Sequence, residues 1–372
     1  MNNKKTVITD GSRIVTESLA RAGADCFIGY PITPANLLYQ YASRRFPLML
    51  PAPDEITALQ WMCGLSATGR LPVTATSFPG LALMLESVNM AFMMELPMVI
   101  VVVQRLGPAT GTATCGAQGD LMLLRGMISG GHQVPVLCPS DFNDCRELSA
   151  RAVSLAAALR TPVVLLTSKE EMMTRKSFIP GPSGGIDAVK REFYSGESPY
   201  VPYDAGESLV PDFLPVGNDR WQVRLNASTH DKKGILQHSG EEALGNTRRL
   251  EEKPFCHLQD YTYYDLDEQE AGTLIVSWGI SAAAARDAAR VLRERGKPVS
   301  LLVAKTLLPV PEIYYDIIDR YKKVVFVEEN LNAQFATLLF GERLPGKIVA
   351  AGTIGRMAGV DEIINSTGLA DR

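Results

Sequence analysis

Short, wholly apolar segments alternate with helical segments through the first half of the chain, and this alternation limits the folds open to it. The clearest apolar segment is Met-Val-Ile-Val-Val-Val at residues 98–103, which is far too short to span a bilayer. A strand that is apolar on both faces is typical of a parallel sheet covered by helices. The alternation therefore predicts a doubly wound parallel α/β sheet.

The strands of this sheet are expected at residues 26–30, 73–76, 98–103, 136–138 and 162–167. Helices are expected at residues 11–24, 36–45, 56–68, 79–94, 121–129 and 140–159, the last with a capping signal in Ser140-Asp141. Residues 176–265 are rich in proline and aromatic residues and have little periodicity, which predicts an irregular connector with one helix near 240–253. From residue 272 the alternation returns. The predicted domains are 1–175, a connector at 176–265, and a second α/β unit at 266–372.

Ligands of an open α/β sheet bind in the loops beyond the carboxyl ends of its strands. Thr33 lies in such a loop, at a junction with the next helix, where a hydroxyl and free N–H groups suit a carboxylate. Arg105 directly follows the 98–103 strand, and a guanidinium there can hold a carboxylate through two hydrogen bonds. The alternatives are that Thr33 only caps the helix start and that Arg105 pairs with a local acid such as Asp120.

Composition excludes several classes of function. The 372 residues carry a formal net charge of -4 and no block of Lys and Arg, so no nucleic-acid partner is expected. Residues 1–10 are polar and lack the apolar core of a signal peptide, and no segment is long enough to span a membrane, so the expected location is the cytoplasm. The six cysteines form no C-x-x-C pair, which argues against an iron–sulfur cluster on this chain. No metal-ligand cluster is evident.

Three motifs occur in order along the first domain: Tyr30-Pro31-Ile32-Thr33-Pro34, Ser77-Phe78-Pro79-Gly80, and Gln104-Arg105-x-Gly107-Pro108-x-Thr110-Gly111. Together they resemble the α subunit of the 2-oxoacid:ferredoxin oxidoreductases, thiamine-diphosphate enzymes that decarboxylate a 2-oxoacid and form an acyl-CoA. The resemblance continues through Thr229–Gly234, Val276–Gly279 and Val327–Asn330. It implies a pyrimidine-type thiamine-diphosphate domain followed by an α/β domain like the transketolase C-terminal domain.

The resemblance also implies roles for single residues. Thr33 and Arg105 match residues that hold the 2-oxoacid carboxylate. The predicted cofactor-binding residues lie in the two loops nearest to them and are Pro31, Ile32, Thr76, Ser77 and Gly80. Phe78 replaces the usual small residue of its turn, so a narrower pocket is expected. Gln118 and Asp120 are expected to shape the substrate pocket, and His132 is either a substrate contact or a turn residue.

One departure concerns the glutamate that activates thiamine diphosphate at its aminopyrimidine N1′. Pro53 stands at that position, and proline cannot make the contact. Either Asp54 or Glu55 replaces it as the catalytic carboxylate, or the cofactor is activated without one, or activity is altered. Both acids also suit the cap and first turn of the helix that begins at about residue 56.

The chain lacks the Gly-Asp-Gly…Asn loop that binds Mg²⁺ and diphosphate. The resemblance therefore implies a β subunit that supplies both sites, with thiamine diphosphate shared at the interface, and further γ and ferredoxin-like δ subunits. The [4Fe-4S] clusters would lie on these partners and pass electrons to ferredoxin or another acceptor, while CoA takes the acyl group. A non-oxidative decarboxylase or carboligase subunit, and a non-catalytic assembly subunit, are the alternatives. The sequence does not choose the 2-oxoacid.

Overall fold

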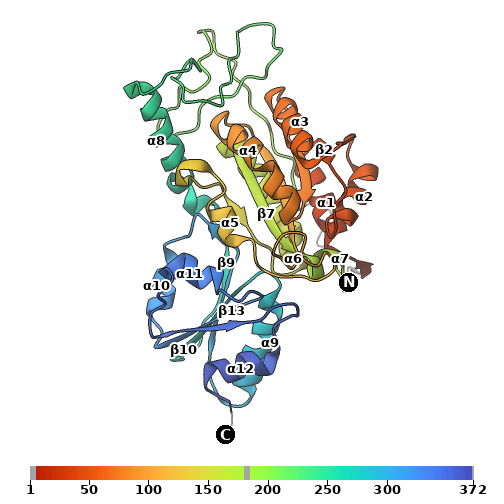
Figure 1. Ribbon diagram of the computed structural model, residues 1–372, viewed down its shortest axis with the longest axis vertical. Coiled ribbons are helices and arrows are strands. Elements are labelled where there is room, and N and C mark those ends of the chain that lie inside the picture. Colours follow the sequence, from red (N-terminus) through yellow and green to blue (C-terminus); the bar gives the residue numbers. More distant parts are fainter. Residues whose placement is uncertain (1–5, 180–184, 371–372) are drawn as a thin grey trace.

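A computed structural model describes residues 6–179 and 185–370. The larger body of the protein is built on the sheet that contains β2 and β7 in Figure 1. This sheet has seven strands in the order β12-β6-β7-β5-β4-β2-β3. Six of its strands are parallel and come from the first part of the chain: β2 (Cys26–Gly29), β3 (Leu48–Pro51), β4 (Pro72–Thr76), β5 (Met98–Gln104), β6 (Val136–Leu137) and β7 (Pro162–Ser168). The predicted doubly wound parallel sheet is confirmed.

Helices cover both faces of this sheet because the central strand is apolar on both. Val99, Val101 and Val103 face α1 (Gly11–Arg21), α2 (Asn36–Arg45) and α6 (Phe142–Leu159). The residues between them, Ile100 and Val102, face α3 (Glu55–Ala67), α4 (Phe78–Met93) and α5 (Leu121–Arg125). Successive side chains of a strand point to opposite faces, so a continuous apolar run places one layer of helices on each side.

Aspartates fix the start of three of these helices. The side chain of Asp10 accepts a hydrogen bond from the N–H of Arg13, and Asp141 accepts from the N–H groups of Asn143 and Asp144. Such caps satisfy donors that have no partner within the helix. The third aspartate, Asp54, belongs to the site described below. The capping signal predicted at residues 140–141 therefore acts through Asp141.

The connector between the two sheets is irregular, as predicted, and contains one long helix, α8 (Glu241–Cys256), followed by a 3₁₀ turn, η2 (Leu258–Tyr261). Glu95 holds α8 in place. It is fully buried, its carboxylate is 2.7 Å from Lys253 Nζ, and it also pairs with Arg249. Burial opposes ionisation, but the charges of Lys253 and Arg249 outweigh it and lower the pKa of Glu95 to about 2. A buried charge cluster thus joins the connector to the end of α4.

The motif Thr229–Gly234 has a structural role within this connector. His230 is buried, with Nδ1 2.6 Å from the carbonyl oxygen of Ser228 and Nε2 3.0 Å from the amide nitrogen of Asn246 in α8. The carboxylate of Asp231 accepts hydrogen bonds from the N–H groups of Lys233 and Ile235. The motif therefore shapes a turn that packs against α8.

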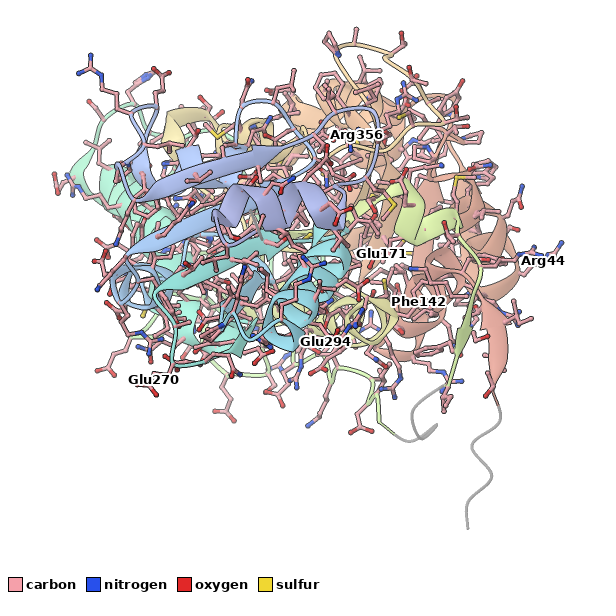
Figure 2. The ribbon with its side chains drawn as sticks, turned by 90° about the horizontal axis from the view of Figure 1, so that it is seen from below. Arg44, Phe142, Glu171, Glu270, Glu294 and Arg356 are labelled. Atoms are coloured by element: carbon pink, nitrogen blue, oxygen red, sulfur yellow. The ribbon has the colours of Figure 1, made fainter. Side chains whose placement is uncertain are left out.

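A second sheet of five strands forms the C-terminal part, with the order β14-β13-β10-β11-β9. Its strands are β9 (Tyr264–Asp267), β10 (Thr273–Trp278), β11 (Ser300–Ala304), β13 (Lys323–Glu328) and β14 (Ile348–Gly352). On one face α9 (Ser281–Glu294) and α12 (Val360–Thr367) pack side by side (Figure 2). On the other face α10 (Ile313–Asp319) and α11 (Gln334–Phe340) join the same apolar cluster as α3 and α4.

One strand crosses between the two parts. β12 (Thr306–Leu308) follows β11 in the chain but pairs antiparallel with β6 of the larger sheet. The N–H of Cys138, just beyond β6, donates to the carbonyl of Lys305 over 2.7 Å. The seven-stranded sheet is therefore completed by a segment from the C-terminal part of the chain.

The structure differs from the predicted elements in several places. The helix expected at 121–129 ends at Arg125, because Gly126 caps it and Gly130 adopts a left-handed φ of 81° in η1 (Ser129–Gly131). The sequence pattern did not predict the short or half-exposed elements β3, β9, β12, α7 (Lys169–Met173), α10 and α12, nor the pair of β1 (Val7–Thr9) with β8 (Lys176–Phe178). Within the described residues, no helix is long and apolar enough to cross a membrane.

Candidate active site

The loops that follow β2 and β5 meet at the carboxyl edge of the larger sheet. Arg105 is buried there, 7% exposed, and its Nη1 donates a hydrogen bond to the main-chain carbonyl of Thr33 over 2.7 Å. Its Nε is buried and has no hydrogen-bond partner among the described residues. A guanidinium that is held on one side and unpaired on another can bind an anion without first moving.

The loop of residues 31–34 lies against this arginine. Pro31 is exposed, while Ile32 and Thr33 are half-buried. Asn36 begins α2 directly afterwards, and the cap position is taken by Ala35, without a side-chain hydrogen bond. Thr33 therefore does not act as the cap of α2, and its main-chain carbonyl positions Arg105 instead.

The turn between β4 and α4 encloses the buried side chain of Glu55. A Cβ placed on Gly80 would lie 2.2 Å from Thr76 Oγ1 and 2.8 Å from Glu55 Oε1, so only glycine allows these groups to approach. Ser77 and Thr74 lie close to Thr76 in the sequence. Their hydroxyl oxygens are buried and have no hydrogen-bond partner among the described residues. Glu55 comes from α3, so two segments distant in sequence present polar groups at one point.

The neighbouring acid, Asp54, has a different position. Its Oδ1 accepts a hydrogen bond from the N–H of Thr57 over 2.7 Å, which makes it the N-cap of α3. This hydrogen bond lowers the pKa of Asp54. Pro53 is exposed just before it. Of the two acids proposed to replace the missing glutamate, Asp54 is bonded to its own helix and Glu55 lies beside Thr76 and Gly80.

Asp120 lies in the loop after Arg105 and is 5% exposed. Its N–H donates to Gln104 Oε1 over 3.4 Å, while its Oδ2 has no hydrogen-bond partner within the described chain. Burial raises the pKa of Asp120 to about 7, although the charge of Arg105 acts in the opposite direction. Asp120 and Arg105 therefore share one electrostatic environment, with unsatisfied polar atoms on both.

Gln118 joins the two parts of the chain. Its side-chain amide donates to the carbonyl of Trp278 over 2.7 Å, and its Oε1 accepts from the N–H of Glu329 over 2.8 Å. Its main-chain carbonyl accepts from Asn330 Nδ2. The motifs Val276–Gly279 and Val327–Asn330 thus fix the loop that carries Asp120. In the sequence alone, the one sign of a link between Gln118 and these two motifs was that all three belong to the stretches that resemble the family.

A cavity of about 360 Å³ opens between this loop and the loops after β13 and β14. Among its lining residues are Phe78, Leu106, Asp120, Glu329 and Leu331. Burial, with the nearby charge of Glu170, raises the pKa of Glu329 to about 7. In the sequence analysis Glu329 lay within the family-like stretch Val327–Asn330 but was given no role. This cavity is called the edge cavity below.

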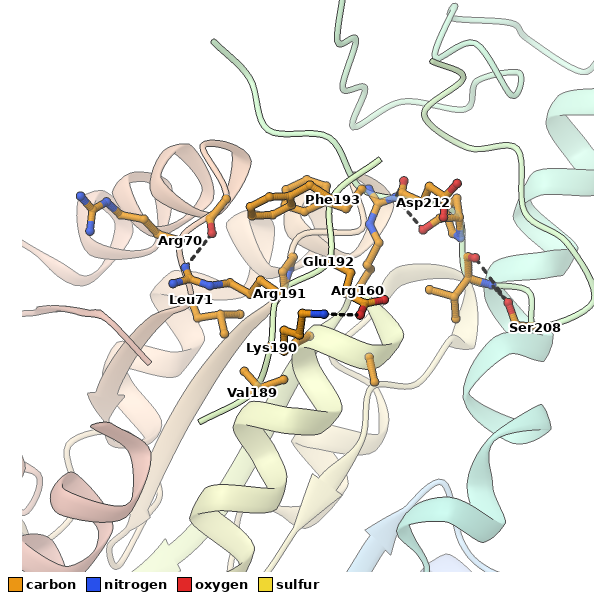
Figure 3. A pocket seen from close by; sticks show the side chains of 17 residues that line it. Arg70, Leu71, Arg160, Val189, Lys190, Arg191, Glu192, Phe193, Ser208 and Asp212 are labelled. Atoms are coloured by element: carbon orange, nitrogen blue, oxygen red, sulfur yellow. Dashed lines mark hydrogen bonds and ion pairs between the residues drawn. The ribbon is translucent and has the colours of Figure 1, made fainter. Parts of the chain in front are cut away.

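A second cavity, of about 390 Å³, lies at the opposite end of the strands and is shown in Figure 3. Leu71 and Pro97, which line it, come directly before β4 and β5, and Arg160 lies two residues before β7. Arg160 donates from Nη1 to the carbonyls of Pro211 and Asp212, so it holds the connector over this end of the sheet. None of the predicted site residues lines this cavity.

His132 contacts α8 and Phe92, and it is not among the described residues that line the edge cavity. Its Nδ1 is 2.7 Å from a carboxylate oxygen of Glu251 in α8, and its ring packs against Phe92 with centroids 5.5 Å apart. Gly130 and Gly131 before it have φ values of 81° and 88°. The contacts match the turn interpretation of His132.

The residues at the carboxyl edge fit the aminopyrimidine and substrate end of thiamine diphosphate. The fit rests on the buried, unpartnered atoms of Ser77 and Arg105 and on the close approach of Glu55 to Gly80. Within residues 6–179 and 185–370 no group of three or more His, Cys, Asp or Glu is arranged to hold a metal ion.

Comparison with known proteins agrees with this geometry. Residues 17–238 match the family described as pyruvate flavodoxin/ferredoxin oxidoreductase, thiamine-diphosphate-binding. The chain is 30% identical to the 2-oxoglutarate synthase subunit KorA of Methanocaldococcus jannaschii, over 88% of this chain and 89% of the relative. It is 32% identical to the ketoisovalerate oxidoreductase subunit VorB of Methanothermobacter thermautotrophicus, over 82% and 81%.

Solved structures show the same relationship. A 2-oxoglutarate:ferredoxin oxidoreductase from Magnetococcus marinus, solved with 2-oxoglutarate, coenzyme A and succinyl-CoA, superposes with a TM-score of 0.92 at 27% identity. The match covers 98% of this chain and 65% of that one. A split-gene transketolase matches with a TM-score of 0.55 at 15% identity, which supports the predicted fold class alone.

Proposed function

We infer the function from the premise that this chain belongs to the pyruvate flavodoxin/ferredoxin oxidoreductase family, whose thiamine-diphosphate-binding part matches residues 17–238. We propose that it is the α subunit of a heteromeric 2-oxoacid:acceptor oxidoreductase, which converts a 2-oxoacid and CoA to an acyl-CoA and CO₂. The observation that carries this proposal is the meeting of Glu55, the Thr76–Gly80 turn and Arg105 at one edge of the sheet.

Each residue has a role that its surroundings support. Arg105, fixed by the carbonyl of Thr33, uses its unpaired Nε to bind the carboxylate of the 2-oxoacid. Glu55 is buried beside Gly80 and, as a carboxylate, would accept a hydrogen bond from the aminopyrimidine. Ser77 offers a further hydroxyl. Thiamine diphosphate, when bound, supplies the carbanion chemistry of decarboxylation, and the protein supplies position and electrostatics.

We propose that a partner subunit completes the cofactor site at this edge of the sheet. Large apolar side chains remain exposed on the two helices that bear Glu55 and Gly80: Ile56 and Trp61 are each 42% exposed and Leu83 is 52% exposed. We assign this surface to a β subunit that holds the diphosphate and Mg²⁺. Partner subunits would also carry the [4Fe-4S] clusters and reduce ferredoxin or a similar acceptor. The six free cysteines suit a reducing cytoplasm.

Pro53 keeps two alternatives open. If Glu55 does not activate the cofactor, the complex is a non-oxidative decarboxylase or carboligase, or this chain is an assembly subunit. Replacement of Glu55 by Gln tests the point, since loss of an acid–base group typically costs about 10²- to 10⁴-fold in turnover. Pro53→Glu is the matched variant, because it places a carboxylate two residues earlier on an exposed position.

The deciding experiment uses the complex purified with its native partners. Thiamine diphosphate and iron are assayed, and a panel of 2-oxoacids is tested for CoA-dependent viologen reduction alongside CO₂ release. CoA-dependent reduction that is lost in Glu55→Gln supports the oxidoreductase. Release of CO₂ without electron transfer contradicts it and favours the decarboxylase. Intact cofactor binding without turnover, restored by Pro53→Glu, favours a subunit that has lost activation.

A further inference from the structure

The edge cavity adjoins the residues assigned to the substrate carboxylate. Leu106, which lines it, follows Arg105 directly, and Phe78 follows Ser77. Asp120, on its wall, interacts electrostatically with Arg105. A 2-oxoacid whose carboxylate lies on Arg105 must extend its remaining carbons away from the sheet. The cavity of about 360 Å³ is the space next to that position.

We propose that the edge cavity receives the side chain of the 2-oxoacid and selects a neutral, apolar side chain over one that carries a second carboxylate. This inference rests on the proposed function. It adds the class of substrate, which membership of the family does not determine. The chain is about equally similar to a 2-oxoglutarate synthase subunit, at 30% identity, and to a ketoisovalerate oxidoreductase subunit, at 32%.

The charge of the cavity wall is the first argument. Two acids, Asp120 and Glu329, line it, and both have a buried oxygen without a hydrogen-bond partner in the described chain. No Lys, Arg or His is among the described residues that line it. A second carboxylate would therefore lie between two acids with no cation opposite. This is unfavourable once the two acids, each with a pKa of about 7, are ionised.

The hydrogen-bond donors of the wall are the second argument. Asn330 Nδ2 already donates to the carbonyl of Gln118 and to Glu328 Oε2. Gln334 Nε2 already donates to the carbonyl of Gly119 over 2.9 Å. These two amides are engaged in holding the two loops together, so they are not free to replace the water around an incoming carboxylate. Asn332 also lines the cavity, and its side-chain amide donates no hydrogen bond within the described residues.

The remaining wall is apolar and suits a hydrocarbon side chain. The large apolar side chains that line it are those of Phe78, Leu106, Pro108, Leu331 and Ile354. Leu331 and Ile354 are 69% and 47% exposed in the chain alone, so a hydrocarbon group would remove apolar surface from water. Each buried methylene contributes about 0.8 kcal/mol, or roughly fourfold in affinity. A branched aliphatic or aryl 2-oxoacid gains from this wall, whereas 2-oxoglutarate does not.

The test ranks acids on the complete complex in two ways. We would compare kcat/KM for 2-oxoisovalerate, 2-oxo-4-methylpentanoate, phenylpyruvate and 2-oxoglutarate, and measure binding of the same acids by calorimetry. At least one apolar acid should exceed 2-oxoglutarate by roughly 100-fold, the usual scale for an unpaired like charge. Equal use of both classes, or preference for 2-oxoglutarate, overturns the inference while leaving the oxidoreductase proposal intact.

Variants make the cause specific. The binding is measured above the pKa of about 7 of the two acids, where both are ionised. Asp120→Asn and Glu329→Gln should each raise the relative binding of 2-oxoglutarate about tenfold, since each then removes one like charge. Glu342→Gln, an exposed acid elsewhere in the C-terminal part, is the matched control and should leave the ranking unchanged. If the two wall variants leave the ranking unchanged as well, the wall does not select the substrate. The calorimetric ranking decides the inference even if no acid is turned over, an outcome that would count against the proposed function instead.

Discussion

Arg105 and Thr33 are 72 residues apart in sequence, yet the guanidinium of one donates to the main-chain carbonyl of the other over 2.7 Å. The bond joins the loop after β2 to the loop after β5. It uses one nitrogen of the arginine and leaves Nε unpaired. The side chain that is assigned to the substrate is thus positioned by the backbone of the loop that resembles the substrate-binding motif.

This arrangement predicts that Arg105→Lys impairs substrate use without loss of folding. Lysine keeps the charge but cannot bond Thr33 and a carboxylate at once with a planar fork. We expect kcat/KM for the best 2-oxoacid to fall about 10- to 100-fold, equivalent to about 1.5–3 kcal/mol, mainly through KM. Arg44→Lys is the control, because Arg44 is exposed in α2, away from the site (Figure 2). An unchanged kcat/KM in Arg105→Lys would remove Arg105 from the substrate site.

Gly80→Ala should weaken cofactor binding. The added methyl would lie 2.2 Å from Thr76 Oγ1 and 2.7 Å from Glu55 Cγ, so the Glu55 side chain must move. We expect at least about a tenfold rise in the dissociation constant of thiamine diphosphate, measured by fluorescence titration of the complex. Gly64→Ala in α3 has nothing within 4 Å of the new methyl and should bind the cofactor normally. Equal binding by both variants would argue that Glu55 does not contact the cofactor.

Asp120 should make stability depend on pH in a particular direction. Its pKa is raised from 3.8 to about 7 in the folded chain, so the folded state holds the proton more tightly than the unfolded state. Its contribution is fully present below about pH 3.8 and is lost as pH rises through about 7. Glu329, raised to about 7, acts in the same sense. The Tm of Asp120→Asn should therefore decline less than that of the wild type between pH 5 and pH 8, roughly the window that these shifts define.

The comparison is made by calorimetry in buffers of constant ionic strength. Asp319→Asn, an acid at the C-terminal end of α10 that pairs with Lys347, serves as the matched control. Superimposable pH profiles for wild type and Asp120→Asn would show that the fold does not raise the pKa of Asp120.

Glu95→Gln should destabilise the protein strongly. The carboxylate pairs with Lys253 over 2.7 Å and with Arg249, and removing its charge leaves two cations in a buried place. Loss of one partner of such a cluster costs about 3–5 kcal/mol, to be measured as the free energy of unfolding in urea. Glu86→Gln, exposed on α4, which ends two residues before Glu95, should change it by less than about 0.5 kcal/mol. A small effect of Glu95→Gln would mean that the connector is held by packing alone.

The sequence predicts the larger sheet well because the patterns that indicate its strands and helices involve residues close together in the chain. Wholly apolar runs, such as residues 98–103, and the caps at Asp54 and Asp141 act through residues a few positions away. The elements that were not predicted depend on distant partners. β12 is three residues long and exists because β6 offers an edge 170 residues earlier, and β9 is half exposed and antiparallel.

The candidate site divides in the same way. Arg105 and Thr33 follow from strand ends and from the family resemblance, and the structure places them in contact. The distinction between Asp54 and Glu55 does not follow from sequence, since both occupy a helix start. It depends on Gly80, which lies 25 residues later and leaves room for only one of them. Glu329 could not be found without the fold, because it reaches the cavity from another sheet.

The pairing of β12 with β6 has a consequence for how the protein can be divided. A gene fragment that ends before residue 306 would leave β6, a buried strand of two residues, as a bare sheet edge. Exposed edges of this kind recruit other chains and favour aggregation. The two sheets also share one apolar cluster, so heating should melt them in a single cooperative transition rather than one after the other. The chain is thus an indivisible folding unit, although its two sheets look like separate modules.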